Sequence, residues 1–246
     1  MFRIGLFLFS CWISSLHALE YQQPDNRLMQ LLDAASGVNW QLSASEQWLL
    51  QTETTAYPQL EMLPKNTTAL AGLLINLPQL SAGLGRGFQH ISVQHMQQAT
   101  RYQWHANSGQ RLFSPRLSPD ENWLSVVVAE PQGLFIELMD LQTGKRKRMR
   151  QRLNAILGIQ YQWLADSSGL VAAIAQSPDT PPRMAIPVQP AVRESAGKAA
   201  KLRTLQQLLQ SDSDAAYFEQ LIQSRLVRVS TRLAIKKIAE LPLYAF

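Results

Sequence analysis

The chain has 246 residues, 46% of them hydrophobic, and a formal net charge of +5. This length accommodates one large domain or two small ones, and the apolar content is ample for a core. The one cysteine, Cys11, excludes a framework of disulfide bonds within the chain. No segment beyond the N-terminus is long and apolar enough to predict a transmembrane helix.

The first eighteen residues have the pattern of a secretory signal peptide. Arg3 supplies a positive start, residues 4–13 are mostly apolar, and Ala18 is a small residue at a cleavage position. We therefore expect a secreted or periplasmic protein. Two alternatives stay open: an ordinary buried N-terminal segment, and a lipid anchor on Cys11, because residues 8–11 resemble a lipoprotein cleavage site.

The first part of the mature chain predicts one helix followed by strands. Residues 26–34 place three leucines on one helical face, and Asp25 or Asn26 caps it. Residues 48–53 and 70–76 predict single strands, separated by a proline-containing loop. Residues 91–104 predict a weaker pair of strands.

The middle of the chain has the clearest pattern. A Ser-Pro-Asp turn precedes a valine-rich run, and tight turns then separate further apolar runs. We expect strands near residues 116–118, 123–130, 134–141 and 145–149. Apolar runs at this spacing, bounded by Gly and Pro turns, are typical of an antiparallel meander in an all-β fold.

The last part of the chain repeats the turn and strand and then departs from it. Residues 159–174 predict another pair of strands, and five prolines exclude regular structure across residues 177–190. Helices are expected at residues 203–209 and 214–226, the second capped by Asp212 or Ser213. Strands follow at residues 226–230 and 234–239, and we expect no closing element after them.

A turn followed by a strand thus occurs three times, which indicates a repeat architecture. We predict an all-β fold: an incomplete β-propeller of about three four-stranded antiparallel blades, with a short helical insertion and an N-terminal signal peptide. The predicted division is 1–18 for the signal peptide and 19–246 for the propeller domain. Its blade-like units are 38–104, 112–152 and 154–242, with the insertion at 177–223.

Recurrence also decides how the polar turn residues are interpreted. Asp120, Glu121 and Asp166 could form an acid/base set, but their similar places in successive repeats favour turn capping. The structural turn residues are Ser118, Asp120, Gly144 and Asp166. No catalytic residue is predicted. His90 and His95 are five residues apart, a poor spacing for metal ligands, so neither a metal nor a cofactor is expected.

One run of the chain is strongly basic. Its members are Lys145, Arg146, Lys147, Arg148 and Arg150. Such a run can bind nucleic acid or an anionic membrane, but it directly follows a strand and a turn, which favours a solvated outer strand. We expect no nucleic-acid partner and keep these residues as a candidate interaction surface. The tryptophans could similarly form a carbohydrate platform, although Trp48 and Trp123 share a repeat position that favours packing between blades.

Several of these segments resemble a known family. The Ser-Pro-Asp turns and residues 138–145, 163–170 and 187–200 are similar to the β-propeller of prolyl oligopeptidase family serine peptidases. Within the family, the likeness is to the glutamyl endopeptidase-like and acylaminoacyl-peptidase-like branch. The resemblance implies a propeller that filters peptides for an α/β-hydrolase domain. The sequence departs from the family pattern at residues 44–46 and 230–234, where the usual turn residues are missing.

The family's catalytic half has no counterpart in this sequence. No Gly-x-Ser-x-Gly nucleophile elbow occurs in it, so no triad residue is assigned. The leading hypothesis is a non-catalytic propeller portion of a secreted peptidase, as a truncated or split product. Its partners would be a separately encoded α/β-hydrolase domain, or other copies of the chain, and peptides. The alternative is an independent extracytoplasmic scaffold that binds proteins or peptides. In both cases uncovered blades predict marginal stability or association.

Overall fold

The computed structural model describes residues 25–33, 35–55, 66–176, 208–209, 211–238 and 243–244. The predicted signal peptide and the proline-rich segment 177–190 lie outside these ranges. The described chain is mostly β, with four antiparallel sheets and two short helices, and its blade-like sheets form the incomplete propeller predicted from the sequence. Neither helix in these ranges has the length and hydrophobicity needed to cross a membrane.

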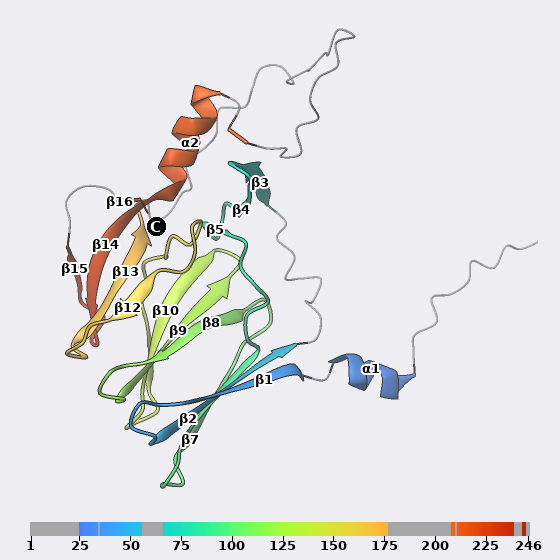
Figure 1. The fold of residues 1–246 in the computed structure, drawn as a ribbon, viewed down its shortest axis with the longest axis vertical. Helices are drawn as coiled ribbons and strands as arrows, with labels where there is room; N and C mark the ends of the chain where they lie inside the picture. The colour runs from blue at the N-terminus through green and yellow to red at the C-terminus, as the bar shows by residue number, and fades with distance from the viewer. Residues whose placement is uncertain are drawn as a thin grey trace, which may run out of the picture.

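Three of the sheets are blade-like (Figure 1). The first sheet has the order β1-β2-β6-β7, with strands Ala35–Leu42, Trp48–Thr55, His90–His95 and Arg101–His105. The second sheet has the order β8-β9-β10-β11, with strands Arg111–Leu117, Trp123–Glu130, Gly133–Asp140 and Arg146–Arg148. The third sheet contains β12 to β16, with strands Tyr161–Trp163, Gly169–Ala175, Gln223–Ser230, Ile235–Lys237 and Leu243–Tyr244.

The fourth sheet is small and lies beside the longer helix. It contains β3 (Thr67–Leu70), β4 (Leu73–Asn76) and β5 (Ser81–Ala82). Helix α2 (Asp212–Ile222) packs on it through Tyr217 and Leu221, and Phe218 adds a partly buried contact. This side of helix α2 therefore covers part of the described fold.

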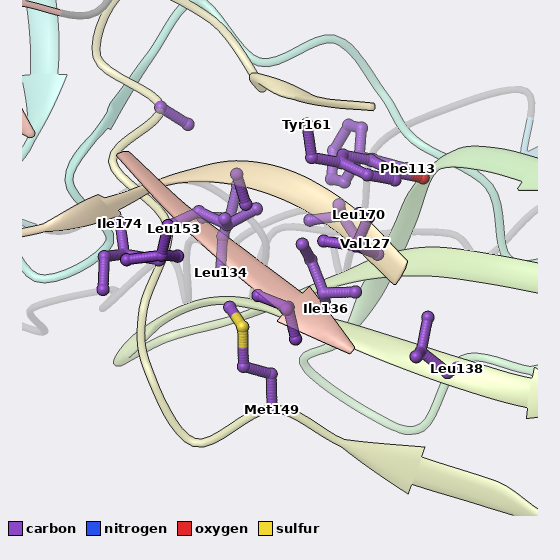
Figure 2. Packing of buried hydrophobic residues seen from close by; sticks show 14 of the residues in the cluster. Phe113, Val127, Leu134, Ile136, Leu138, Met149, Leu153, Tyr161, Leu170 and Ile174 are labelled. Carbon is purple, nitrogen blue, oxygen red and sulfur yellow. The ribbon is translucent and has the colours of Figure 1, made fainter. Parts of the chain in front are cut away.

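The three blade-like sheets stack because side chains alternate between the two faces of each strand. Leu124, Val126 and Val128 of β9 pack towards the first sheet, where they meet Trp48, Leu50 and Ile91 among others. Val127 and Ala129, on the opposite face of β9, pack towards the third sheet (Figure 2). The second sheet is therefore buried on both faces, and β9 is buried at seven of its eight residues.

Several expected elements need correction. Residues 70–76 do not form one strand: Ala71 and Gly72 have φ values of 52° and 77°, and this turn joins β3 to β4. The second helix begins two residues earlier than expected, with Ser211 as its cap, and ends at Ile222 because Gln223 starts β14. Leu208 and Leu209 are not helical, and the rest of the predicted helix 203–209 lies outside the described residues.

The sequence analysis also missed two strands that matter for the architecture. It predicted no strand at β1, which is the edge strand of the first sheet. It also predicted no strand at residues 243–244, whereas β16 pairs with the start of β14 within the third sheet. Helix α1 (Asn26–Asp33) was expected, and Asp25 caps it by accepting a hydrogen bond from the Arg27 amide at 3.1 Å.

Candidate functional site

The turns that open the three blade-like sheets share one backbone geometry. In each, a residue two positions before the strand has a left-handed φ: Glu46 at 60°, Glu121 at 56° and Ser167 at 56°. The amide of that residue donates to the carbonyl three residues earlier. The amide of the first turn residue donates to the carbonyl of the first residue of the strand that follows. Repetition of the turn in space explains why its sequence recurs.

Asp120 and Ser118 fill the turn of the second sheet. The Asp120 carboxylate accepts from Ser118 Oγ at 2.5 Å and from both the backbone and the side-chain nitrogen of Asn122. Burial acts to raise the pKa of Asp120, but these hydrogen bonds outweigh it and hold the pKa below its usual value. Asp166 likewise accepts from Ser168, which lowers its pKa. A carboxylate held in its ionised form is a poor general acid.

Side chains also connect neighbouring turns, which the sequence analysis missed. The Asp120 amide donates to Ser167 Oγ at 2.9 Å, so the second turn is joined to the third. Glu121 accepts from the Ser45 amide and from Ser43 Oγ, both at 2.8 Å, so it is joined to the first. Because these contacts span more than 40 residues, local sequence carries no signal for them.

Gly144 lies at the turn between β10 and β11. Its φ is +69°, a conformation that L side chains rarely adopt, and an added Cβ would lie 2.5 Å from the ring of Tyr102. The turn of the second sheet therefore packs directly against β7 of the first sheet. Gly144 is placed where it serves both a turn and a contact between sheets.

The basic run forms the edge strand β11 and the residues around it. Arg146 lies over the Trp104 ring at 4.8 Å, Lys147 over Trp123 at 5.7 Å and Arg148 over Phe135 at 4.2 Å. These contacts hold the cations against aromatic rings of the fold. Lys145 and Arg150 are exposed at the two ends of the strand.

Arg148 also bridges two carboxylates that the sequence analysis did not single out. It donates to both oxygens of Glu130, at 2.7 and 2.6 Å, and lies 3.9 Å from Glu137. Hydrogen bonds from Arg148 lower the pKa of Glu130, while burial raises the pKa of Glu137. Glu130 accepts further bonds from Gln110 and Gln132. This geometry is that of a satisfied structural ion pair, in which the carboxylate has no oxygen left for a substrate.

The histidines are dispersed between two faces of the first sheet. His90 Nδ1 lies 3.4 Å from Glu53, and its ring stacks on His105 with centroids 4.2 Å apart. His95 is buried on the other face and accepts from the Gln97 and Gln98 amides. Within the described ranges, no three His, Cys, Asp or Glu side chains are grouped so that they could hold a metal ion.

Two hollows border the first strands of the sheets. One, of about 440 Å³, lies between the first and second sheets and is lined by polar groups of Asn39, Gln41, Thr52 and Arg86 together with apolar side chains. It opens where β8 bulges between Phe113 and Arg116, because the bulge interrupts pairing with β9. The other, of about 580 Å³, lies on the third sheet against β12 and β13. Concave sites that combine apolar walls with a few polar groups are the usual form of ligand pockets.

Comparison with known proteins gives matches among solved structures only. No protein-family model matches the sequence. No curated protein sequence matches it either. An acylaminoacyl peptidase of Pyrococcus horikoshii superposes with 12% identity and a TM-score of 0.41, over 88% of this chain and 26% of that chain. A second acylaminoacyl peptidase, in complex with Z-Gly-Gly-Phe-chloromethyl ketone, gives 11% identity and a TM-score of 0.40, over 85% and 26%. The chain thus spans about a quarter of the length of each peptidase.

Proposed function

We propose that this chain is the non-catalytic propeller portion of a secreted prolyl oligopeptidase-type serine peptidase, as a truncated or split product. The observation that carries the proposal is the repeated turn. The segments that resemble the family, residues 138–145 and 163–170, lie at turns and strands of successive blade-like sheets. Sequence likeness and spatial repetition therefore coincide at the same residues.

The role assigned to the chain is to admit and position peptides for a hydrolase domain supplied separately. The hollow between the first and second sheets supports this role. Asn39, Gln41 and Thr52 offer donors and acceptors for a peptide backbone. Phe88 and Phe113 supply apolar wall. Cleavage itself needs an activated nucleophile and an oxyanion hole, which would come from the partner domain.

Chemical labelling tests the absence of a nucleophile. The purified chain is incubated with a fluorophosphonate probe and with peptide substrates, and the expected result is neither labelling nor cleavage. Stoichiometric labelling of one serine would overturn the proposal. The DNA downstream, translated in all frames, shows whether further blades and a Gly-x-Ser-x-Gly segment follow.

A second experiment tests the gating role directly. A separately produced α/β-hydrolase domain of the same family is assayed with a short and a long peptide, with and without this chain. We expect the chain to raise the ratio of kcat/KM for the short peptide to that for the long peptide. The variant Thr52→Val should reduce this effect, whereas Leu74→Ala, on the small sheet, should leave it unchanged. An unaltered ratio on adding the chain counts against gating.

The secretory pathway is part of the proposal and has its own test. The apolar run after Arg3 and the small residue Ala18 support cleavage by a signal peptidase. The N-terminal sequence of the exported chain is then expected to begin at Leu19. A chain that instead carries a lipid on Cys11 would establish the lipid-anchored alternative, and Cys11→Ser would release it.

The alternative function is an independent extracytoplasmic scaffold that binds an acidic protein or peptide. The observation in its favour is that Lys145 and Arg150 are exposed at the ends of the edge strand β11. Charge reversal at these two positions leaves the contacts of Arg146 and Arg148 intact, so it is a cleaner test than reversing the whole run. The scaffold is favoured if the double variant Lys145→Glu/Arg150→Glu no longer binds a stable partner that the Lys236→Glu control still binds.

A further inference from the structure

One face of the first sheet carries large apolar side chains that no described part of the chain covers. Val38, Trp40 and Leu42 alternate along β1 and are 45%, 57% and 47% exposed. Their neighbours Trp48 and Leu50, directed to the opposite face, are buried against the second sheet. We call the exposed side the leading face of the first sheet, because it points away from the sheets that follow in the chain.

The repeated turn identifies what these positions do elsewhere in the same molecule. The Ser43 amide donates to the Trp48 carbonyl, and the Leu164 amide donates in the same way to the Gly169 carbonyl. Ser43 and Leu164 are therefore equivalent positions. Counting back from them, Leu42 corresponds to Trp163 and Trp40 to Tyr161. Tyr161 and Trp163 are only 5% and 8% exposed, because both pack on the second sheet. There the Trp163 indole donates to Ser125 Oγ at 2.9 Å. The first strand of a sheet therefore packs its aromatic positions on the sheet before it.

The surface that receives them recurs too. In the second sheet it is made by Ser125 and Val127 of β9. By the same register, Val171 and Ala173 hold these positions on β13 of the third sheet. They line the 580 Å³ hollow together with Leu226 and Gln162, their partners across the neighbouring strands. We call this side the trailing face of the third sheet. Among the described strands, none forms a sheet that packs on this receiving surface.

We propose that two copies of this chain associate head to tail, with Trp40 and Leu42 of each copy inserted into the hollow on the trailing face of the other. A second copy is the occupant because one chain carries both halves of the contact, the exposed aromatic position and the empty receptor. The contact repeats the arrangement between the second and third sheets. Two copies bring together six blade-like sheets, within the range of about four to eight found in closed propellers.

The composition of the leading face sets the strength of the association. Gln51 and Glu53 on β2 stand where the second sheet has Val126 and Val128. The apolar part of the contact is thus limited to β1 and its immediate neighbours, with a polar rim over β6. An apolar centre with a polar rim is typical of non-obligate interfaces. The pair therefore dissociates on dilution, and each chain stays folded.

Sedimentation equilibrium over a range of concentrations tests the proposal. The chain is expected to show a monomer–dimer equilibrium. Trp40→Arg and Val171→Glu should each weaken dimerisation at least about thirtyfold, as expected for the loss of a central apolar contact. The matched control is Leu74→Arg, because Leu74 is equally exposed, at 58%, but lies on the small sheet. Its dimerisation constant should be unchanged.

Mixing the two variants identifies the geometry. In a head-to-tail pair, Trp40→Arg and Val171→Glu combine into a heterodimer with one native contact and one new Arg–Glu contact, so dimer returns on mixing. If Trp40→Arg is monomeric and Val171→Glu still dimerises, two leading faces meet and the proposal is wrong. A monomer at every concentration, or a ladder of larger oligomers, also overturns it. None of these outcomes bears on peptide gating, which is measured separately with the hydrolase domain.

Discussion

The second and first sheets share strand order and turn geometry but differ in how they are covered. The second sheet is packed on both faces, so β9 is a nearly continuous apolar run. In the first sheet, β2 alternates between buried Trp48 and Leu50 on one face and Gln51 and Glu53 on the other. The comparison shows that position in the stack, and not strand order, decides which residues a blade needs.

The largest expected contrast comes from removing apolar side chains from the two sheets. Ile136→Ala, at a fully buried position of the second sheet, should lower the free energy of unfolding by about 2–5 kcal/mol, because it leaves a cavity. Val38→Ala, on the leading face, should cost less than about 0.5 kcal/mol in dilute monomer. Urea denaturation measures both. A large cost for Val38→Ala would show that something covers that face, and the comparison would fail.

The contacts of two carboxylates give the next contrast. Glu130 is 8% exposed and pairs with Arg148 at 2.6 Å, whereas Glu53 is 27% exposed and lies 3.4 Å from His90. Glu130→Gln should cost about 1–3 kcal/mol, because a bond to a charged group is lost at a buried site. Glu53→Gln should cost less than about 1 kcal/mol.

The effect at Glu130 should depend on pH with a definite sign. Hydrogen bonds from Arg148 hold the pKa of Glu130 below its ordinary value of 4.5, although burial opposes them. Its contribution is therefore complete above that value and is lost as the pH falls through the folded-state pKa. The stability gap between the native chain and Glu130→Gln should narrow on acidification, and a gap that widens would refute the assignment.

Substitutions at two glycines test the contact between the first and second sheets. Gly144→Ala should destabilise the chain by more than about 1 kcal/mol, because it adds a clash with Tyr102 to the cost of a left-handed φ. Gly109 has a similar φ of +76° but nothing within 4 Å of an added Cβ, so Gly109→Ala measures the backbone cost alone. Thermal unfolding compares the two. Equal shifts in Tm would mean that Tyr102 simply moves aside.

The sequence predicted the second sheet best because its signals are local. Residues 123–130, expected as a strand, form β9 with the same bounds, and both faces of that strand are mainly apolar. β1 was missed although Val38, Trp40 and Leu42 alternate with polar residues, which is the period-2 pattern of a strand; only the glycine near its start weakens that signal. Its place as the edge strand of the first sheet depends on pairing with β2, which a local pattern does not contain.

The candidate site was less predictable for the same reason. The sequence showed the basic run, but not that Arg146 and Arg148 lie over aromatic rings from other strands. It favoured turn capping over an acid/base role for Glu121, but did not show that its contacts are with serines more than 70 residues earlier. What could have pointed to them is the repeat, since equivalent turns in neighbouring blades lie close together.

The smallest expected effect tests these turn contacts. Glu121→Gln weakens the hydrogen bonds that Ser43 and Ser45 donate to this side chain, and it should lower the free energy of unfolding by about 0.5–1 kcal/mol. Glu46 holds the same left-handed position in the first turn, but its side chain is exposed, so Glu46→Gln is the matched control and should cost nothing measurable.

Acid titration sharpens the comparison at this position. Burial acts to raise the pKa of Glu121, but hydrogen bonds from Ser45 and Ser43 lower it more, so the pKa lies below 4.5. The difference between the two variants should be present at neutral pH and vanish as the pH falls through the folded-state pKa of Glu121. Persistence of the difference in acid would mean that Glu121 acts through packing and not through these hydrogen bonds.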